Sequence, residues 1–346
     1  MNRLPPDDID HILLHTKDLW KELRKSRVFI AGGTGFFGKW LLESFLAAND
    51  KFNLKASITV LSRNPHKFAE KYPHFAANPA LALIKGDVRN FVFPHGNFTH
   101  LIHGAVDASL KLIQEEPLLI FDTIIQGTRR ILEFAEARGV KKALMISSGA
   151  VYGRQPADMS HMPESFLGAP DPTDQQSVYG EGKRVAEMLC AIYARQCGLN
   201  VVLARGFAFI GPYLPLATHY AAGNFIRDAL RGGPIRIQGD GTTYRSYLYA
   251  ADLAAWLWTI LIKGRPGQAY NVGSENALTI AKLARLVAAQ CGKVEVKISQ
   301  SPSPGKPAER YVPSTAKARA DLGLNAWIDI TTAIRRTIAF YSAVCD

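Results

Sequence analysis

The feature that most constrains the fold is a glycine-rich turn near the amino terminus, between an apolar run and a helical pattern. The run Val28–Ala31 leads into Gly32, Gly35 and Gly38 at the spacing G-x-x-G-x-x-G, and a helix is predicted over Lys39–Ala48. Such glycines allow a tight turn, admit phosphate close to the backbone and let helix and strand pack closely. Because the helix N-terminus also directs N–H groups at an anion, the order predicts a site for a dinucleotide pyrophosphate.

Strand-like and helical segments alternate through the first two thirds of the chain. Helical patterns occur, for example, at Thr128–Arg138 and Gly180–Cys197. This alternation predicts a parallel sheet with helices on both faces, and ligands of such folds lie beyond the carboxyl ends of the strands. The predicted strands are Val28–Ala31, Ser57–Leu61, Leu81–Ile84, His100–His103, Ala143–Ser147 and Val201–Arg205.

The alternation loosens after Gly211, where prolines and glycines mark loops. A short strand is predicted at Ala269–Val272, and the loop Ser301–Pro307 is a candidate lid. Helices are predicted at about 224–231, 252–263 and 331–342.

We expect three parts along the chain. Residues 1–25 form an amphipathic helical extension that packs on the main domain or on a second subunit. Residues 26–210 plus 243–275 form the dinucleotide-binding domain. Residues 211–242 plus 276–346 form the smaller substrate-binding domain.

Composition excludes several classes of protein. The net charge of +11 in 346 residues raises the question of nucleic acid, but the basic residues are scattered, which argues against it. No apolar run approaches the roughly 20 residues that a membrane span needs, and the first residues lack the apolar core of a signal peptide. The four cysteines have no metal or disulfide spacing, so we expect free thiols, no metal site and a cytoplasmic enzyme.

Two motifs carry side chains suited to proton transfer. Ser148 directly follows a predicted strand, and Tyr179 and Lys183 stand where a helix begins, on one face of that helix. A tyrosine hydroxyl, with a pKa of about 10, is a poor base at neutral pH unless an ammonium group stabilises the phenolate. We therefore expect Lys183 to lower the pKa of Tyr179, which would let the phenol exchange a proton with a substrate hydroxyl or carbonyl.

With these motifs in this order, the chain resembles the extended short-chain dehydrogenase/reductase family of nucleotide-sugar epimerases, dehydratases and reductases, over about residues 26–345. The resemblance implies an α/β fold, a doubly wound parallel Rossmann sheet with a smaller C-terminal α/β domain. Further matching pieces are Gly86-Asp87-Val88, Ile102-His103-Gly104-Ala105, Gly127-Thr128, Val151-Tyr152-Gly153, Arg205, Gly211-Pro212, Arg245-Ser246-Tyr247 before Asp252-Leu253, Tyr270-Asn271-Val272-Gly273, and Lys317 with Leu322-Gly323.

The resemblance also implies roles for individual residues. Ser148, Tyr179 and Lys183 would be catalytic, and the last two would also contact the cofactor. A nucleotide-diphosphate sugar would contact Asn224 and the guanidinium groups of Arg245 and Arg310, which suit phosphate. The other expected cofactor contacts are Gly32, Thr34, Gly35, Phe36, Phe37, Gly38, Ser62, Arg63, Asp87, Val88, Gly104 and Ala105.

The end of the second strand indicates which cofactor is bound. NAD-binding members place a carboxylate there to accept a hydrogen bond from the ribose 2′-hydroxyl. Here the strand runs into Ser62 and Arg63, and no carboxylate occurs before Glu70. Arg63 could clamp a 2′-phosphate or stack on adenine, and we predict NADP(H) over NAD(H).

Other departures from the family pattern bear on the reaction. Family 4,6-dehydratases carry acidic residues after the catalytic serine, where this chain has Gly149 and Ala150, neither able to do acid–base work. Ile124 and Ala208 replace two family asparagines, which puts fine substrate assignment in doubt. His103 is expected to be structural, and His219 is a weaker candidate proton donor.

These observations predict an NAD(P)-dependent oxidoreductase, with NADPH-dependent reduction of a 4-keto-hexose on a nucleotide as the leading interpretation. A C4 epimerase that keeps its cofactor bound is the alternative, and a dehydratase or decarboxylase is a third. A non-enzymatic cofactor-binding protein is disfavoured because Ser148, Tyr179 and Lys183 are all present. A homodimer through two helices per subunit is the family expectation, and a helix at 110–134 could serve it or could equally belong to the core.

Overall fold

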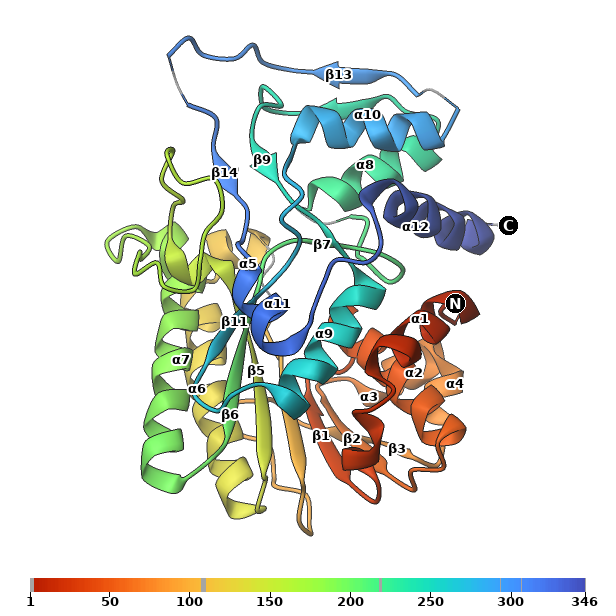
Figure 1. The fold of residues 1–346 in the computed structure, drawn as a ribbon, viewed down its shortest axis with the longest axis vertical. Helices are drawn as coiled ribbons and strands as arrows, with labels where there is room; N and C mark the ends of the chain where they lie inside the picture. Colours follow the sequence, from red (N-terminus) through yellow and green to blue (C-terminus); the bar gives the residue numbers. More distant parts are fainter. Residues whose placement is uncertain (1–2, 107–109, 218–219, 293, 306, 346) are drawn as a thin grey trace.

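The structure, a computed structural model, describes residues 3–106, 110–217, 220–292, 294–305 and 307–345. Its centre is a seven-stranded sheet in the order β3-β2-β1-β4-β5-β6-β11, in which every pair of neighbours is parallel (Figure 1). This confirms the predicted doubly wound sheet. The strands are β1 Arg27–Ala31, β2 Ser57–Ser62, β3 Leu81–Lys85, β4 His100–His103, β5 Lys142–Ser148, β6 Val201–Gly206 and β11 Ala269–Val272.

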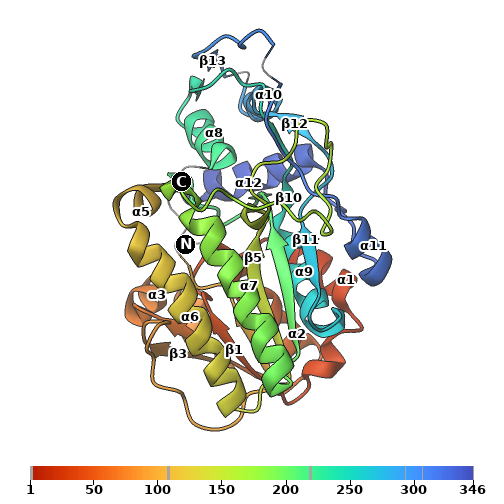
Figure 2. The ribbon, with the colours of Figure 1, turned by 90° about the vertical axis from the view of Figure 1, so that its left-hand side faces the viewer.

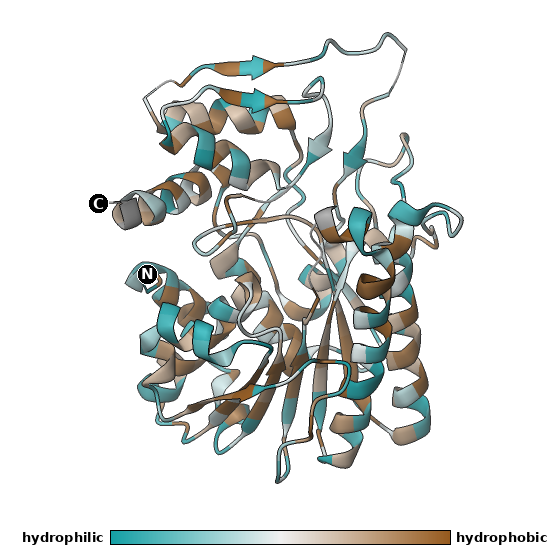
Figure 3. Cartoon of the chain, turned by 180° about the vertical axis from the view of Figure 1, so that it is seen from behind, coloured by the Kyte–Doolittle hydropathy of each residue, from teal (hydrophilic) through white to brown (hydrophobic). Residues whose placement is uncertain are grey.

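Alternate side chains of each strand enter two separate cores, because successive residues of a strand point to opposite faces. In β1, Val28 and Ile30 join the core under α2 and α9, whereas Phe29 and Ala31 join the core under α6 and α7. Figure 3 shows hydrophobic colour along the strands between the two helical layers. The helices beside the sheet are α2 Phe36–Lys51, α3 Pro65–Lys71, α4 Pro73–Ala76, α5 Leu110–Glu115, α6 Pro117–Ala137, α7 Val178–Cys197, α9 Ala250–Lys263 and α11 Ala316–Leu322.

The predicted helix over 110–134 is wrong in one respect, because two helices occupy this stretch. α5 ends at Glu115 and α6 begins at Pro117. A proline fits the first turn of a helix but cannot continue one, since it has no N–H to donate. α6 then packs along α7 on one face of the sheet (Figure 2).

The later part of the chain forms a cap above the carboxyl ends of the sheet strands (Figure 1). Its three-stranded sheet, β12-β9-β14, joins segments from three separate stretches of sequence. β9, which the predicted division gives to the dinucleotide-binding domain, therefore pairs with two strands of the substrate-binding part. The cap elements are α8 Ala221–Leu230, β8 Ile235–Ile237, β9 Tyr244–Arg245, β12 Leu278–Thr279, α10 Ile280–Gln290, β13 Val296–Ile298, β14 Arg310–Tyr311 and α12 Ile330–Cys345.

Short elements link the sheet to the cap and cover its edge. β7 Phe209–Ile210 pairs with β10 Leu248–Tyr249 between the two. The N-terminal extension folds as α1 Pro6–Thr16 and a 3₁₀ turn at Trp20–Leu23, and α1 packs on α9 and α2 of the same chain. Two further 3₁₀ turns, Gly149–Tyr152 and Gln175–Ser177, flank the site described next.

Polar contacts fix the extension in place. His11 Nε2 lies 2.6 Å from a carboxylate oxygen of Asp252 at the start of α9. The hydroxyl of Tyr249 donates to the buried carboxylate of Asp8 at 2.7 Å, and Arg336 of α12 pairs with the same carboxylate. The extension therefore joins the sheet to the last helix of the cap.

Candidate active site

The glycine turn has the close packing that its spacing predicts. Gly32 has a φ of +95°, and a β-carbon there would lie 2.6 Å from the carbonyl carbon of Gly104 in the loop after β4. A β-carbon at Gly38 would lie 2.2 Å from the carbonyl oxygen of Gly33, so helix and turn touch through backbone. The first turn of α2 has no side-chain cap and no acidic residue. Its N–H groups can therefore receive a phosphate, which fits a dinucleotide.

The structure brings the other expected cofactor contacts to the same edge of the sheet. Ser62 ends β2 and Arg63 follows it, Asp87 follows β3, and Gly104 follows β4, and these strands lie on either side of β1 in the order β3-β2-β1-β4. The side chain of Val88, by contrast, is buried against Gly127 of α6, so only its backbone can face a ligand. Of the other expected contacts, Thr34, Gly35, Phe36 and Phe37 lie in the glycine turn and the start of α2, and Ala105 follows Gly104.

Arg63 is exposed directly after β2 and lies near Asp87 and Arg89, which follow β3. The carboxylate of Asp87 accepts two bonds of 2.9 Å from the guanidinium of Arg89. This contact, with a smaller contribution from the charge of Arg63, holds the pKa of Asp87 below its usual range. A negatively charged group bound after β2 would therefore pair with Arg63, because the guanidinium of Arg89 is already paired with Asp87.

Ser148, Tyr179 and Lys183 lie together where β5 ends and α7 begins. Ser148 is the last residue of β5, and its hydroxyl accepts the N–H of Ala150 at 3.1 Å. The phenol of Tyr179 lies near enough for Ser148 to act on its pKa. The Lys183 ammonium is 6.0 Å from the centre of the Tyr179 ring and donates to the carbonyl of Ile146 at 2.8 Å. One hydroxyl, one phenol and one buried ammonium thus share a pocket at the carboxyl edge of the sheet.

The expected lowering of the Tyr179 pKa is not found. Burial raises the pKa of this phenol above its ordinary value, more than the nearby Ser148 lowers it. Burial also lowers the pKa of Lys183 to about 8, despite the nearby charge of Glu187. The reason is geometric: Lys183 extends toward a carbonyl of β5 rather than toward the phenol oxygen. The phenol of Tyr179 is consequently protonated and neutral at physiological pH.

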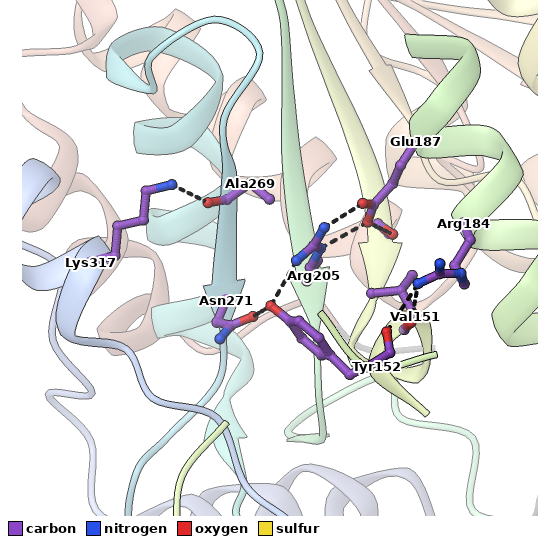
Figure 4. A network of polar contacts seen from close by, with 10 residues as sticks. Val151, Tyr152, Arg184, Glu187, Arg205, Ala269, Asn271 and Lys317 are labelled. Carbon is purple, nitrogen blue, oxygen red and sulfur yellow. Dashed lines mark hydrogen bonds and ion pairs between the residues drawn. The ribbon is translucent and has the colours of Figure 1, made fainter. Parts of the chain in front are cut away.

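A polar network behind the pocket fixes the backbone that carries these groups (Figure 4). Glu187 of α7, one turn beyond Lys183, pairs with Arg205 of β6 at 2.6 Å and accepts the Ser147 hydroxyl at 2.5 Å. Arg205 donates to the Tyr152 hydroxyl at 2.9 Å, and that hydroxyl donates to Asn271 of β11 at 2.8 Å. The network ties α7 to three strands, which sets where Tyr179 and Lys183 lie.

The departures from the family pattern have structural counterparts. Ile124 is buried in an apolar cluster with Ile120 and Ala186, against which Tyr179 packs, so this side of the phenol is dry. His103 lies 3.3 Å from the Thr128 hydroxyl through Nε2, and its Nδ1 has no hydrogen-bond partner within the described chain. Burial lowers the pKa of His103 to about 3, which fits a structural, neutral ring. His219 lies outside the described residues.

The three expected sugar-nucleotide contacts are not all brought together. β9 and β14 run in parallel with Tyr311 opposite Arg245 and Arg310 opposite Tyr244, so the two arginines lie on opposite faces. The Arg310 guanidinium stacks 4.1 Å from the centre of the Tyr244 ring. Asn224 lies on α8 and accepts from Arg227 at 3.0 Å.

Tyr311, which no sequence motif marked, lies beside Ser148. Ser148 acts on the pKa of its phenol, and the Tyr311 hydroxyl lies 2.6 Å from where a β-carbon of Gly149 would stand. Its ring lies 4.6 Å from that of Phe207, centre to centre. The preceding Arg310 draws attention to this strand, but a two-residue strand has too little periodicity to show which residue faces the site.

Other site classes find no support in the described part of the chain. No group of three His, Cys, Asp or Glu side chains there could hold a metal ion. No helix in the same part combines the length and apolar character needed to cross a bilayer.

Comparison with known proteins agrees with this architecture. UDP-glucuronic acid decarboxylase 3 of Arabidopsis thaliana is 30% identical over 299 residues, which cover 86% of this chain and 83% of that protein. UDP-glucuronic acid decarboxylase 1 of Xenopus tropicalis is 26% identical, over 92% of this chain and 73% of that one.

Two solved structures have the same fold. The dTDP-glucose 4,6-dehydratase DesIV of Streptomyces venezuelae, solved with NAD, has a TM-score of 0.79 at 23% identity, over 92% of this chain and 97% of its own. The UDP-glucose 4-epimerase of Thermotoga maritima, solved with UDP-glucose, has a TM-score of 0.76 at 21% identity, over 92% and 100%. Residues 28–273 match the family described as the NAD dependent epimerase/dehydratase family, and the chain belongs to that family.

Proposed function

We propose that this protein is an NAD(P)-dependent oxidoreductase that interconverts a hydroxyl and a carbonyl at C4 of a sugar attached to a nucleoside diphosphate. The observation that carries the proposal is the trio of Ser148, neutral Tyr179 and buried Lys183 at the edge that also holds the glycine turn. The substrate class is supported by the named substrates of the relatives and by Arg245, which faces the site.

The leading reaction is reduction of a 4-keto sugar. A bound nicotinamide supplies the hydride to C4. Ser148 donates a hydrogen bond to the carbonyl oxygen, and Tyr179 transfers its proton to that oxygen as the C–O double bond becomes single. The raised pKa of Tyr179 favours this direction, because the neutral phenol is the proton donor. Lys183 would hold the ribose of the cofactor.

Two alternatives are supported by particular observations. The likeness to a UDP-glucose 4-epimerase supports epimerisation, in which the same residues oxidise C4 and then reduce its other face. The 30% identity to a UDP-glucuronic acid decarboxylase supports oxidation of a uronic acid followed by loss of carbon dioxide. Elimination of water is less supported, since Gly149 and Ala150 offer no acid or base.

Product mass and chromatographic retention together separate these reactions in one experiment. The purified enzyme is incubated with UDP- and dTDP-hexoses, hexuronates and 4-keto-6-deoxyhexoses, with and without NADPH. Reduction adds two hydrogens, epimerisation leaves the mass unchanged, and decarboxylation removes carbon dioxide. Nucleotide released on denaturation is measured in parallel: stoichiometric bound cofactor would indicate a redox-neutral cycle. If none of these sugars gives a product of new mass or of new retention time, the proposal is overturned.

We also propose NADP(H) as the preferred cofactor, on the strength of Arg63. Replacing Arg63 by alanine is expected to weaken NADPH binding about tenfold or more and to leave NADH binding nearly unchanged, because a guanidinium–phosphate contact contributes roughly 1.5–3 kcal/mol. Titration of both cofactors by fluorescence measures this. Arg89→Ala is the matched control, since Arg89 is occupied by Asp87. Equal loss of both cofactors in R63A would point to adenine stacking instead.

A homodimer through α6 and α7 remains a proposal, supported by apolar side chains exposed on both helices. Leu118 is 78% exposed and Met188 is 62% exposed. A charge buried without a partner in an interface is costly, so Met188→Glu is expected to convert a dimer into monomers. Light scattering coupled to size exclusion measures the mass. Leu167→Glu, an exposed loop change, is the control.

We further propose that the cofactor binds to residues 26–210 plus 243–275 and the sugar nucleotide to residues 211–242 plus 276–346, with Arg245 at their junction.

A further inference from the structure

Tyr311 reaches the active site from the cap. It lies on β14, opposite Arg245 of β9, and the Arg245 guanidinium is 5.6 Å from the centre of its ring. Arg310 and Tyr244 form the corresponding pair on the other face of the same strands. The cap sheet therefore presents one phenol and one guanidinium to the catalytic pocket, and a second such pair away from it.

The hydroxyl of Tyr311 fills the space above Gly149. A β-carbon at Gly149 would lie 2.6 Å from this oxygen and 2.8 Å from the Phe207 ring, so no side chain fits there. Ser148 precedes Gly149 in the chain and lies near enough to act on the pKa of the same phenol. Two phenols, those of Tyr179 and Tyr311, thus converge on one serine hydroxyl, one from α7 and one from the cap.

The surroundings keep Tyr311 a hydrogen-bond donor. Burial raises the pKa of its phenol to about 12, although Ser148 and Arg245 lower it. The other groups acting on it are the phenols of Tyr152 and Tyr220. At neutral pH the hydroxyl is protonated. Since Tyr179 acts at the reacting oxygen, a donor beside the same serine can reach an oxygen on an adjoining part of the sugar.

We infer that Tyr311 is a second hydroxyl donor of the catalytic pocket, which binds a sugar oxygen next to the reacting C4 and selects substrates that carry one there. The inference rests on the proposed C4 chemistry. Of the carbons around C4, C3 carries a free hydroxyl, and C6, attached through C5, carries a hydroxyl or a carboxylate in sugars that are not 6-deoxy. Tyr311 is accordingly a specificity-determining residue, placed on β14 directly opposite Arg245 of β9.

The test removes one oxygen atom from the protein and one from the substrate. Tyr311→Phe keeps the ring against Phe207, and Tyr244→Phe is the matched control on the opposite face. We expect Y311F to lower kcat/KM about 10- to 100-fold, as for loss of a buried hydrogen bond to substrate, with cofactor affinity and melting temperature nearly unchanged. Y244F should stay within about twofold of the wild type.

Substrate analogues test the inference directly, because a purely structural role of Tyr311 would not change how strongly the enzyme discriminates against a deoxy sugar. The wild type should discriminate against either the 3-deoxy or the 6-deoxy analogue, and Y311F should lose that discrimination for the same analogue. Gly149→Ala, which displaces the Tyr311 hydroxyl without changing Tyr311, should reproduce the loss. If the wild type is active and Y311F discriminates as the wild type does, the inference fails and the proposed function stands. If the wild type acts on no nucleotide sugar, both fall.

Discussion

Replacing Tyr179 by phenylalanine is expected to lower kcat by about 10²- to 10⁴-fold, the range that positioned acid–base groups contribute. The change removes the phenol oxygen near Ser148 and keeps the ring in its apolar cluster with Ile124. The glycine turn is untouched, so cofactor affinity should stay near that of the wild type. Single-turnover hydride transfer, followed by nicotinamide absorbance, measures the chemical step apart from product release.

Tyr193→Phe is the matched control for this variant. Tyr193 lies on the same helix, α7, but packs in the core beneath the sheet rather than at its carboxyl edge. Y193F should therefore turn over at the wild-type rate. If Y179F keeps the wild-type rate of hydride transfer, Tyr179 is not the proton donor and the assignment of Ser148 and Lys183 loses its basis.

Replacing Lys183 by methionine should have opposite effects on activity and stability. Activity should fall by at least about 100-fold, because the group that we propose to hold the cofactor ribose and to support the proton transfer is lost. Stability at pH 7 should rise, because burial disfavours the ammonium and lowers its pKa from 10.5 to about 8. A neutral side chain of similar length carries no such desolvation cost.

The pKa shift of Lys183 determines whether the free energy of unfolding rises or falls with pH. Between pH 8 and 10.5 the unfolded chain still holds the Lys183 proton and the folded chain has released it, so the free energy of unfolding rises with pH. Above pH 9 the buried thiol of Cys190, whose pKa is raised from 9.0 to about 12, acts in the opposite sense. Thermal melts at several pH values should thus show a rise from about pH 8 to 9, and K183M should flatten it.

Lys39→Met is the control that separates the effect of losing a buried lysine on stability from the effect of losing Lys183 on activity. Lys39 is also buried, with a pKa lowered to about 8, but it lies between the rings of Tyr72 and Tyr213, outside the catalytic pocket. K39M should share the stabilisation and the flattened pH dependence and keep wild-type activity. Equal activity in K183M and K39M would show that Lys183 is an ordinary buried lysine.

The sheet was predictable because its signals are local. A glycine turn, apolar runs of four to six residues and helical spacing each act over one strand or one helix, and parallel pairing then follows from their alternation. β4 and β11 occupy the predicted residues, and the strand after which Ser148 was placed ends at Ser148 itself. The break at Pro117 was also visible in the sequence, since proline begins helices but does not continue them.

The sequence by itself determined the sheet, the dinucleotide turn and the presence of Ser148, Tyr179 and Lys183. Only the tertiary structure decided three further points: Lys183 extends toward Ile146, Arg245 and Arg310 face opposite ways, and Tyr311 meets Ser148. The physical reason is shared. pKa values depend on burial, which sums contacts from the whole chain, and the two-residue strands of the cap take their facing from partners far away in sequence rather than from a pattern of their own.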